Sequence, residues 1–221
     1  YGYKTCGVWN SAEEIAANPH FSDDAPGGIR IVDTNNDGSL TPEDRVALGT
    51  PYPDFTWGIT NTFQIKDFDI SFLIQGVQGI TVLNGDVYYN ETKKWNKKYT
   101  KNRWVSAEHP GDGKTPYQNV KTGHDLMLTD YPLQNASYAC LRNFTVGYTL
   151  PATAARKIKL SGVRFYVSGS NLFYIWGSGY KGINPESRMT SGDYSSAMIS
   201  GYQRGGFPLT STISAGFDIN F

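Results

Sequence analysis

The last thirteen residues, LTSTISAGFDINF from Leu209 to Phe221, decide the fold. Counted back from Phe221, every second residue is apolar except Ser211, and the residues between them are all polar or small. An alternation with a period of two places the two sets on opposite faces of a β-strand. A strand that crosses a bilayer needs roughly 9–11 residues, apolar toward lipid and polar toward the lumen. The stretch fits such a strand, and it also fits a strand of a soluble all-β protein.

Four further runs alternate in the same way. Phe55–Ile65 and Phe68–Ile74 are separated only by Lys66 and Asp67, which predicts a tight hairpin turn. The other two runs are Tyr138–Leu150 and Gly162–Tyr174. In the first of these, the pattern assigns one face to Arg142, Phe144, Val146, Tyr148 and Leu150.

The connections between these runs alternate in length. Residues 1–54, 80–137 and 175–208 are long and polar, whereas residues 66–67 and 151–161 are short. In an antiparallel up-and-down sheet, alternate connections lie at the same end, so all long connections fall at one end. Outer-membrane barrels have this arrangement, with short periplasmic turns and long extracellular loops. We therefore expect an extracellular loop over 1–54, barrel strands and loops over 55–221, and a periplasmic C-terminus.

Five strands are too few to close a barrel in a membrane. The smallest membrane barrels have about eight strands, and an open edge in lipid leaves backbone groups unpaired. The sequence therefore predicts the last strands of a larger antiparallel transmembrane β-barrel. Phe55–Ile65 and Leu209–Phe221 would pair with strands outside this sequence.

Composition excludes several classes of function. The 221 residues include 20 Lys and Arg and 20 Asp and Glu, so there is no excess positive charge that would favour binding to nucleic acid. No run of 18 apolar residues predicts a transmembrane helix. The two cysteines, Cys6 and Cys140, have no metal-binding spacing, and whether they pair stays open. No GxSxG, HExxH or P-loop motif is present, so we expect no enzyme.

The stretch DTNNDGSLTPED, Asp33 to Asp44, resembles a Ca²⁺-binding loop. Oxygen-bearing side chains stand at its positions 1, 3, 5 and 12, and Gly38 stands at position 6, where the loop turns sharply. The final carboxylate is Asp where such loops usually have Glu, and neighbouring Glu43 is an alternative. An Asx-rich turn without metal is the other interpretation. The predicted structural calcium ligands are Asp33, Asn35, Asp37, Ser39 through its carbonyl, and Asp44.

Aromatic residues interleave with lysines in the 80–137 connection. This composition suits either stacking on glycans or packing of the loop onto itself. The residues are Tyr88, Tyr89, Trp95, Tyr99, Trp104 and Tyr117.

In order and spacing, the chain resembles the C-terminal part of SusC/RagA-type TonB-dependent outer-membrane transporters of Bacteroidota. No single matching stretch is decisive, but the order and spacing of the matching stretches along the chain are specific. The matching stretches are the Asp33–Asp44 loop, Pro53–Gly58, Phe68–Phe72, Gln75–Gly79, Arg103–Trp104, Thr115–Tyr117, Leu141–Pro151, Val167–Phe173, Gly182–Glu186 and Phe207–Leu209. One departure is Asn184, where the family usually has Asp before Pro-Glu.

The resemblance implies a 22-stranded barrel with a plug domain and a TonB-contacting segment outside these residues. It implies energy-dependent import of oligosaccharides or peptides beneath a SusD-like surface lipoprotein. It also implies that the terminal aromatic residue, Phe221, is recognised during barrel assembly.

Two alternatives stay open at this point. A secreted, calcium-stabilised β-sandwich that binds carbohydrate would share the alternation and the Asp-rich loop. An enzyme with catalytic carboxylates in the long loops is the weaker alternative.

Overall fold

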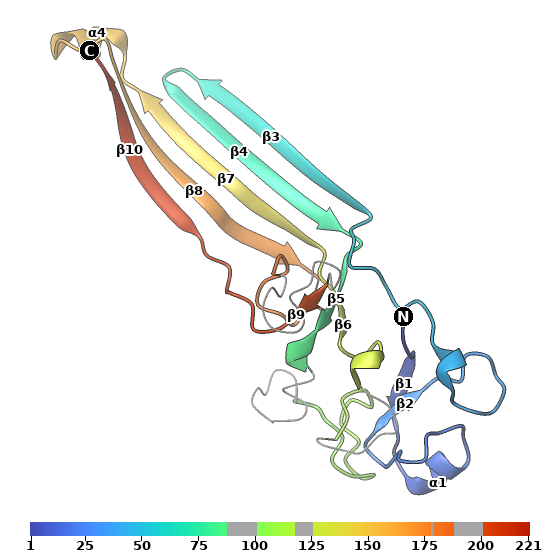
Figure 1. The fold of residues 1–221 in the computed structure, drawn as a ribbon. Coiled ribbons are helices and arrows are strands. Elements are labelled where there is room, and N and C mark those ends of the chain that lie inside the picture. Colours follow the sequence, from blue (N-terminus) through green and yellow to red (C-terminus); the bar gives the residue numbers. More distant parts are fainter. Residues whose placement is uncertain (88–100, 118–125, 178, 188–200) are drawn as a thin grey trace.

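The computed structural model describes residues 1–87, 101–117, 126–177, 179–187 and 201–221. Its main feature is a five-stranded sheet in the order β10-β8-β7-β4-β3, with every neighbouring pair antiparallel (Figure 1). β3 and β10 form its edges, and no other strand of the described residues pairs with them. The strands follow the predicted runs: β3 (Phe55–Ile65), β4 (Phe68–Gln78), β7 (Tyr138–Thr149), β8 (Gly162–Trp176) and β10 (Thr212–Asn220).

The predicted hairpin joins β3 to β4. Ile65 pairs with Phe68, which leaves Lys66 and Asp67 as a two-residue turn. Lys66 has φ of 54°, in the left-handed region that tight hairpin turns use. The hairpin prediction is confirmed, and β4 continues past the predicted end at Ile74 to Gln78.

Short and long connections leave opposite ends of the sheet. The β3–β4 turn, the short helix α4 (Ala152–Lys157) and the end of β10 lie together at one end (Figure 1). The long connections emerge at the other end. The pattern indicated only a short connection at 151–161; its Ala-Thr-Ala-Ala-Arg-Lys sequence favours a helix, which Pro151 precedes.

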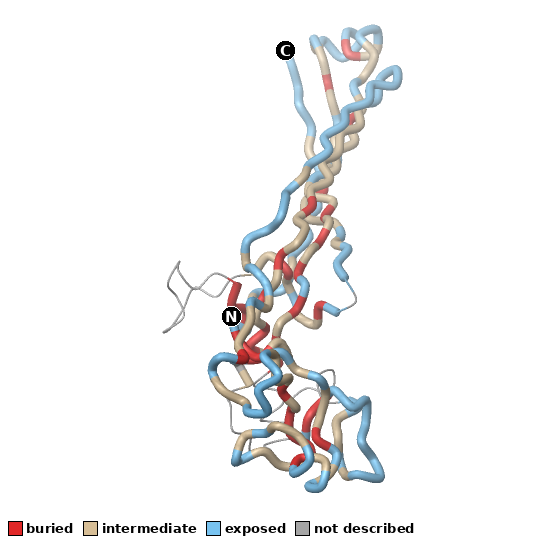
Figure 2. Tube along the Cα trace, turned by 90° about the vertical axis from the view of Figure 1, so that its right-hand side faces the viewer, coloured by how far each residue is buried: buried red, intermediate tan, exposed pale blue. Residues whose placement is uncertain are grey.

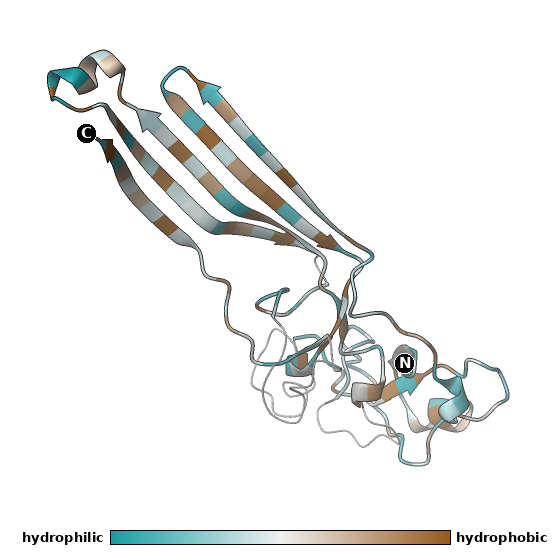
Figure 3. Ribbon diagram, turned by 45° about the horizontal axis from the view of Figure 1, so that its top comes forward, coloured by the Kyte–Doolittle hydropathy of each residue, from teal (hydrophilic) through white to brown (hydrophobic). Residues whose placement is uncertain are grey.

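The sheet is a single layer with one apolar face. Hydropathy alternates along each strand (Figure 3). Other described residues do not cover the apolar side chains. The exposed fraction of the residue is 57% for Phe55, 54% for Ile59 and 65% for Phe217. The tube in Figure 2 shows few buried residues along the strands. The other exposed apolar residues of these strands include Phe63, Ile65, Phe68, Phe165, Val167, Phe173, Ile175, Ile213 and Ile219.

The described parts of the long connections fold into a loop region, which we define as the described residues within 1–54, 79–137 and 177–211. It contains β1 (Thr5–Val8) paired with β2 (Ile29–Ile31), and β5 (Thr81–Asn84) between β6 (Leu133–Asn135) and β9 (Tyr202–Gln203). It also contains the helix α1 (Ala12–Ala16) and the 3₁₀ turns η1 (Pro42–Asp44) and η2 (Leu126–Leu128).

Among the described residues, the clusters of buried apolar side chains lie in the loop region. One cluster is built on Ile80, Val82, Ala136 and Tyr180, and a second on Tyr3, Ile29 and Ile31. Within the described residues, no helix is both long enough and apolar enough to span a membrane.

A β-bulge interrupts the regular pairing in β7. Two residues of β7, Arg142 and Asn143, lie opposite a single residue of β4, Leu73. A bulge re-aims the side chain it carries. Arg142 consequently bonds to Gln75 on the polar face, and the prediction that Arg142 shares the face of Phe144 was wrong.

Candidate functional site

The loop from Asp33 to Asp44 folds around its first carboxylate. Asp33 Oδ1 accepts a hydrogen bond from the Asn36 amide at 2.7 Å, and Oδ2 accepts one from the Gly38 amide at 2.9 Å. Asn36 has φ of 58° and Gly38 has φ of 85°. These two left-handed residues curl the chain back over Asp33, as the sequence pattern predicts at Gly38.

Two of the other predicted ligands lie side by side. Asn35 Nδ2 donates to Asp37 Oδ2 at 2.9 Å, and Asp37 Oδ1 accepts the Ser39 amide at 2.8 Å. Their oxygens therefore share one exposed loop with Asp33. Among the described residues, no three His, Cys, Asp or Glu side chains are grouped so that they could hold a metal ion.

Asp44 is the one buried member of the predicted set, with 0% exposure. Its Oδ1 accepts the Thr34 amide and its Oδ2 accepts the Thr41 amide, both at 2.8 Å. Burial alone raises the pKa of Asp44, but hydrogen bonds from the amides of Thr41, Thr34 and Asn35 outweigh it and hold the pKa below its usual value. Asp44 thus ties the two ends of the loop together as a carboxylate.

The loop should therefore open in acid. Because the folded pKa of Asp44 is lowered, its stabilisation is complete above the ordinary pKa of 3.8 and is lost as the pH falls through the lower folded value. Hydrogen exchange at the Thr34 and Thr41 amides, corrected for intrinsic rates, should accelerate below about pH 4. In Asp44→Asn, exchange should be fast at every pH. Equal protection in the variant at neutral pH would contradict this role.

A second polar group is centred on Arg142, and we call it the Arg142 cluster. Its Nε donates to Gln75 Oε1 at 3.1 Å, and Nη1 donates to Asn171 Oδ1 at 2.8 Å and to Tyr174 Oη at 3.0 Å. Nη2 donates to Glu186 Oε1 at 2.7 Å. One guanidinium therefore joins β4, β7 and β8 to the loop region. Sequence reasoning missed it because every one of these partners is remote in the chain.

The residues on either side of Glu186 form further hydrogen bonds within the loop region. Asn184 Oδ1 accepts the Glu186 amide at 2.9 Å, and its Nδ2 donates to the Phe207 carbonyl at 3.1 Å. Gln203 of β9 donates to the Pro185 and Ser187 carbonyls at 3.3 and 2.7 Å. The amide of Asn184 supplies a donor that an aspartate in its place would lack. The departure from the family pattern thus has a structural use.

An ionic ladder crosses the polar face near the short connections. Arg164 of β8 bonds to both oxygens of Asp69 on β4, at 3.0 and 2.6 Å, and to Asp218 of β10 at 3.3 Å. β7 runs between β8 and β4, and its residue beneath the pair is Gly147. A Cβ at Gly147 would collide with the carboxylate of Asp69 and the guanidinium of Arg164. The missing side chain is therefore what allows the pair to cross β7.

Two of the loop aromatics pack against residues 1–54. The rings of Trp104 and Tyr117 meet edge to face at 6.0 Å, and a Cβ at Gly27 would touch both. Trp104 Nε1 also donates to Asn10 at 2.9 Å. Packing is thus the role of these two aromatics in the structure. Tyr88, Tyr89, Trp95 and Tyr99 lie outside the described residues.

Comparisons with known proteins agree on one kind of protein. No family model matches the chain. The chain is 30% identical over 230 residues to TonB-dependent receptor P26 of Formosa agariphila, covering 100% of this chain and 22% of that protein. It is 26% identical over 192 residues to TonB-dependent receptor SusC of Bacteroides thetaiotaomicron, covering 86% of this chain and 17% of that protein. The chain therefore spans about a fifth of the length of these relatives.

Solved structures match the fold. The RagAB peptide transporter matches with a TM-score of 0.70 at 18% identity, covering 100% of this chain and 22% of that chain. The RagAB peptide importer in its open-open state matches with a TM-score of 0.69. These matches confirm the predicted fold class, an antiparallel β-barrel segment that forms part of a larger protein. The proteins named here are receptors and transporters, and none is named as an enzyme.

Proposed function

We propose that the chain is part of an outer-membrane importer of oligosaccharides or peptides, because it is similar to TonB-dependent receptors over 86–100% of its length. The relatives are named as TonB-dependent receptors, and the structural neighbour as a peptide importer. Because the chain spans about a fifth of those proteins, the activity is assigned to the complete transporter.

The observation that carries this proposal is the single-layer sheet. Its apolar face has no covering layer within the described residues, and both edge strands lack a partner there. A soluble sandwich buries such a face against a second sheet. A membrane barrel turns it toward lipid and continues it at both edges. The sheet therefore favours the transporter over the carbohydrate-binding sandwich.

The proposed orientation follows from the two ends of the sheet. Short connections and the end of β10 would face the periplasm, and the loop region would face the cell exterior. There it would meet a SusD-like surface lipoprotein and contribute to the cargo cavity. TonB would act on a part of the transporter outside this sequence.

Neighbouring positions of β10 test the membrane location. With Cys6 replaced by Ser, we expect a spin label at Phe217→Cys to be accessible to oxygen dissolved in lipid. A label at Asp218→Cys, one residue further on the opposite face, should be accessible to a water-soluble nickel reagent instead. Both are measured in the full transporter in liposomes. Equal water accessibility at the two positions would rule out the lipid-facing assignment.

Import itself is tested by uptake of labelled oligosaccharides and peptides into cells. Deleting the gene should abolish uptake of at least one cargo, as should collapsing the proton gradient that energises TonB. A surface lipoprotein should co-purify with the transporter. Unchanged uptake of both cargo classes without the gene would refute the proposal.

We also propose that the Asp33–Asp44 loop binds a structural Ca²⁺ ion. Support comes from the donor set, since Asp33, Asn35 and Asp37 present oxygen atoms from one exposed loop and Ca²⁺ prefers oxygen ligands. The ion would brace an extracellular loop and take no part in transport chemistry.

Removing one carboxylate should weaken this ion binding. Asp33→Ala should raise the Ca²⁺ dissociation constant by about tenfold or more, because a charged ligand is lost. Calorimetry on the purified transporter measures it. Asp23→Ala, an exposed charge outside the loop, is the matched control. Identical calcium binding by both variants would leave the loop as an Asx-rich turn.

A further inference from the structure

The connection between β7 and β8 carries a cluster of positive charges, which we call the basic segment and define as residues 156–159. Arg156 and Lys157 lie in the last turn of α4, and Lys159 follows just beyond it. All three are exposed, and within the described residues none of them forms an ion pair. Ile158 lies between them and is 57% exposed although it is apolar.

The acidic groups at the same end of the sheet lie elsewhere. Residues 138–176, which span β7, α4 and β8, contain no Asp or Glu. In the β3–β4 turn, the charge of Asp67 is offset by its neighbour Lys66. The ionic ladder around Arg164 lies on the polar face, where both of its carboxylates are already bonded. The remaining acid is the carboxylate of Phe221, which forms no ion pair with a described residue.

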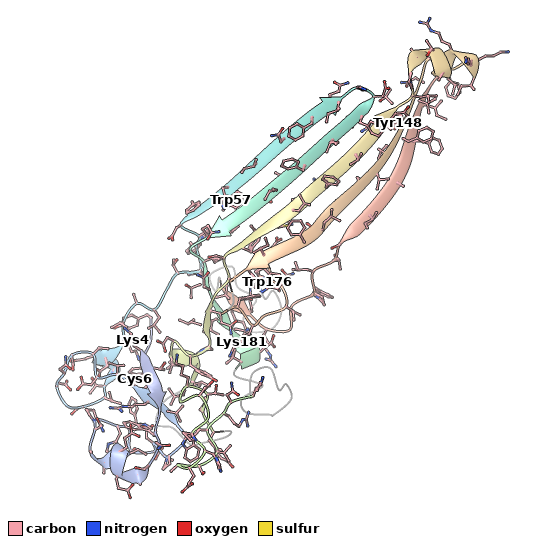
Figure 4. The ribbon with its side chains drawn as sticks, turned by 180° about the vertical axis from the view of Figure 1, so that it is seen from behind. Lys4, Cys6, Trp57, Tyr148, Trp176 and Lys181 are labelled. Carbon is pink, nitrogen blue, oxygen red and sulfur yellow. The ribbon has the colours of Figure 1, made fainter. Side chains whose placement is uncertain are left out.

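A row of aromatic residues marks the level at which the apolar face ends. Strand pairing aligns four of them, one from each of four neighbouring strands: Phe68, Tyr148, Phe165 and Phe217. The rings of Phe68 and Tyr148 lie 4.8 Å apart. Tyr148 lies at the end of the sheet remote from Trp57 (Figure 4). Membrane barrels carry such girdles where the hydrocarbon meets the headgroups.

α4 lies directly beyond this row. Ala152 follows Tyr148 by four residues, which is at most about 13 Å along a strand and about 10 Å along the membrane normal for a strand tilted by about 40°. The headgroup layer on each side of a bilayer is roughly 5–8 Å thick. Because the long side chains of Lys and Arg carry their charge well away from the backbone, the charges of the basic segment can reach the headgroups.

α4 also covers the end of the apolar face. Val163 is 6% exposed, whereas Phe165, two residues further along the same face of β8, is 51% exposed. α4 contacts β8, and its Ala155 is fully buried. The basic segment is therefore continuous with the apolar side of the sheet and lies apart from the ionic ladder on the polar face.

We propose that the basic segment binds the headgroups of anionic phospholipids in the periplasmic leaflet, with Arg156, Lys157 and Lys159 as counter-charges to the lipid phosphates. Ile158 buries its side chain at the boundary between headgroups and acyl chains, as apolar residues of interfacial segments do. The inference rests on the proposed function, because it requires the sheet to lie in the outer membrane.

Two lipids with the same acyl chains test the proposal on the purified full-length protein. Dioleoylphosphatidylglycerol is anionic, and dioleoylphosphatidylcholine has no net charge. We expect native mass spectrometry to show tighter binding of the anionic lipid. Equal binding of the two lipids would overturn the inference.

Charge-removing variants locate the binding. Each cation near an anionic lipid surface contributes about fivefold in affinity, so replacing Arg156, Lys157 and Lys159 together by Gln should weaken binding of the anionic lipid about tenfold or more. Binding of the neutral lipid should not change. An unchanged affinity of the triple variant for the anionic lipid would refute the assignment.

Two further variants control for charge and for folding. One replaces three exposed lysines of the loop region by Gln, namely Lys4, Lys101 and Lys114. It removes the same charge far from α4 and should bind the anionic lipid as the unaltered protein does. The other combines Lys157→Arg with Lys159→Arg, which keeps the charge and should keep the binding. Loss of binding in either variant would contradict the inference.

A spin label at Ile158→Cys, with Cys6 replaced by Ser, tests the location of the segment in liposomes. We expect the label to be accessible to oxygen dissolved in lipid. Access to the water-soluble nickel reagent alone, or to neither reagent because another protein segment covers the site, would refute lipid binding here. If the label at Phe217→Cys is still in lipid, only this inference fails. Water accessibility at both positions would refute the membrane location as well.

Discussion

Replacing Arg142 by Ala should detach residues 184–187 from the sheet and destabilise the protein by about 2–3 kcal/mol. The side chains of Arg142 and Glu186 are 23% and 30% exposed, so their 2.7 Å ion pair is shielded from water. Truncation removes the charge partner of Glu186 and the donors to Gln75, Asn171 and Tyr174 together. A partly buried carboxylate left without its partner accounts for most of the loss.

Hydrogen exchange and the unfolding temperature of the full-length protein measure the effect. Exchange should rise at the Glu186 and Ser187 amides, while the β3–β4 hairpin keeps its protection. The unfolding temperature of Arg142→Lys should lie between those of Arg142→Ala and the unaltered protein, since one ammonium cannot reproduce the paired donors of a guanidinium.

The control removes an arginine at the opposite end of the sheet. Arg156 lies exposed on α4, so Arg156→Ala should change stability by no more than about 0.5 kcal/mol. If Arg142→Ala were equally mild, or if it lowered the protection of all strands uniformly, the cluster would have no special role in holding the loop region.

The strands were predictable because their information is local. Alternation over Phe55–Ile65 or Gly162–Tyr174 depends on the side chains of one segment, and the turn at Lys66 and Asp67 follows from its length. The order of the connections then gave the two ends of the sheet. The strands and the turn need only neighbouring residues, whereas the two ends of the sheet need the order of the connections along the whole chain; the strands, the turn and the separation of short from long connections agree with the structure (Figure 1).

The polar contacts were not predictable because they depend on register. The bulge that turns Arg142 to the polar face comes from pairing between β7 and β4, which no single segment encodes. The small sheet of β5, β6 and β9 unites segments from 81 to 203. The spacing predicts Asp44 as a calcium ligand, which stays a prediction, but its amide partners Thr34 and Thr41 become visible only in the folded loop.

The second large effect concerns Gly147, and here a single methyl group should be destabilising. Gly147→Ala places a Cβ where Asp69 and Arg164 bond across β7. The pair must separate, at a cost of about 1–2 kcal/mol, reduced from the buried value because both side chains are 32% exposed. The unfolding temperature of the full-length protein should fall accordingly.

A second glycine in the same sheet is the matched control for this variant. In β3, a Cβ at Gly58 would meet its nearest atoms at 3.8 and 3.9 Å, which is ordinary contact. Because Ala restricts the unfolded chain more than Gly does, Gly58→Ala should be neutral or stabilising by up to about 1 kcal/mol. The two substitutions are chemically identical, so opposite signs would isolate the effect of the space above Gly147.

A double-mutant cycle decides whether the ion pair is the cause. In an Asp69→Ala background there is no pair left to displace, so adding Gly147→Ala should produce little further loss. Additive losses would show that the methyl group disturbs β7 in some other way. A glycine in the middle of a strand weakens that strand by itself. With additive losses, the ladder of Asp69, Arg164 and Asp218 would not be what compensates for this weakening at Gly147.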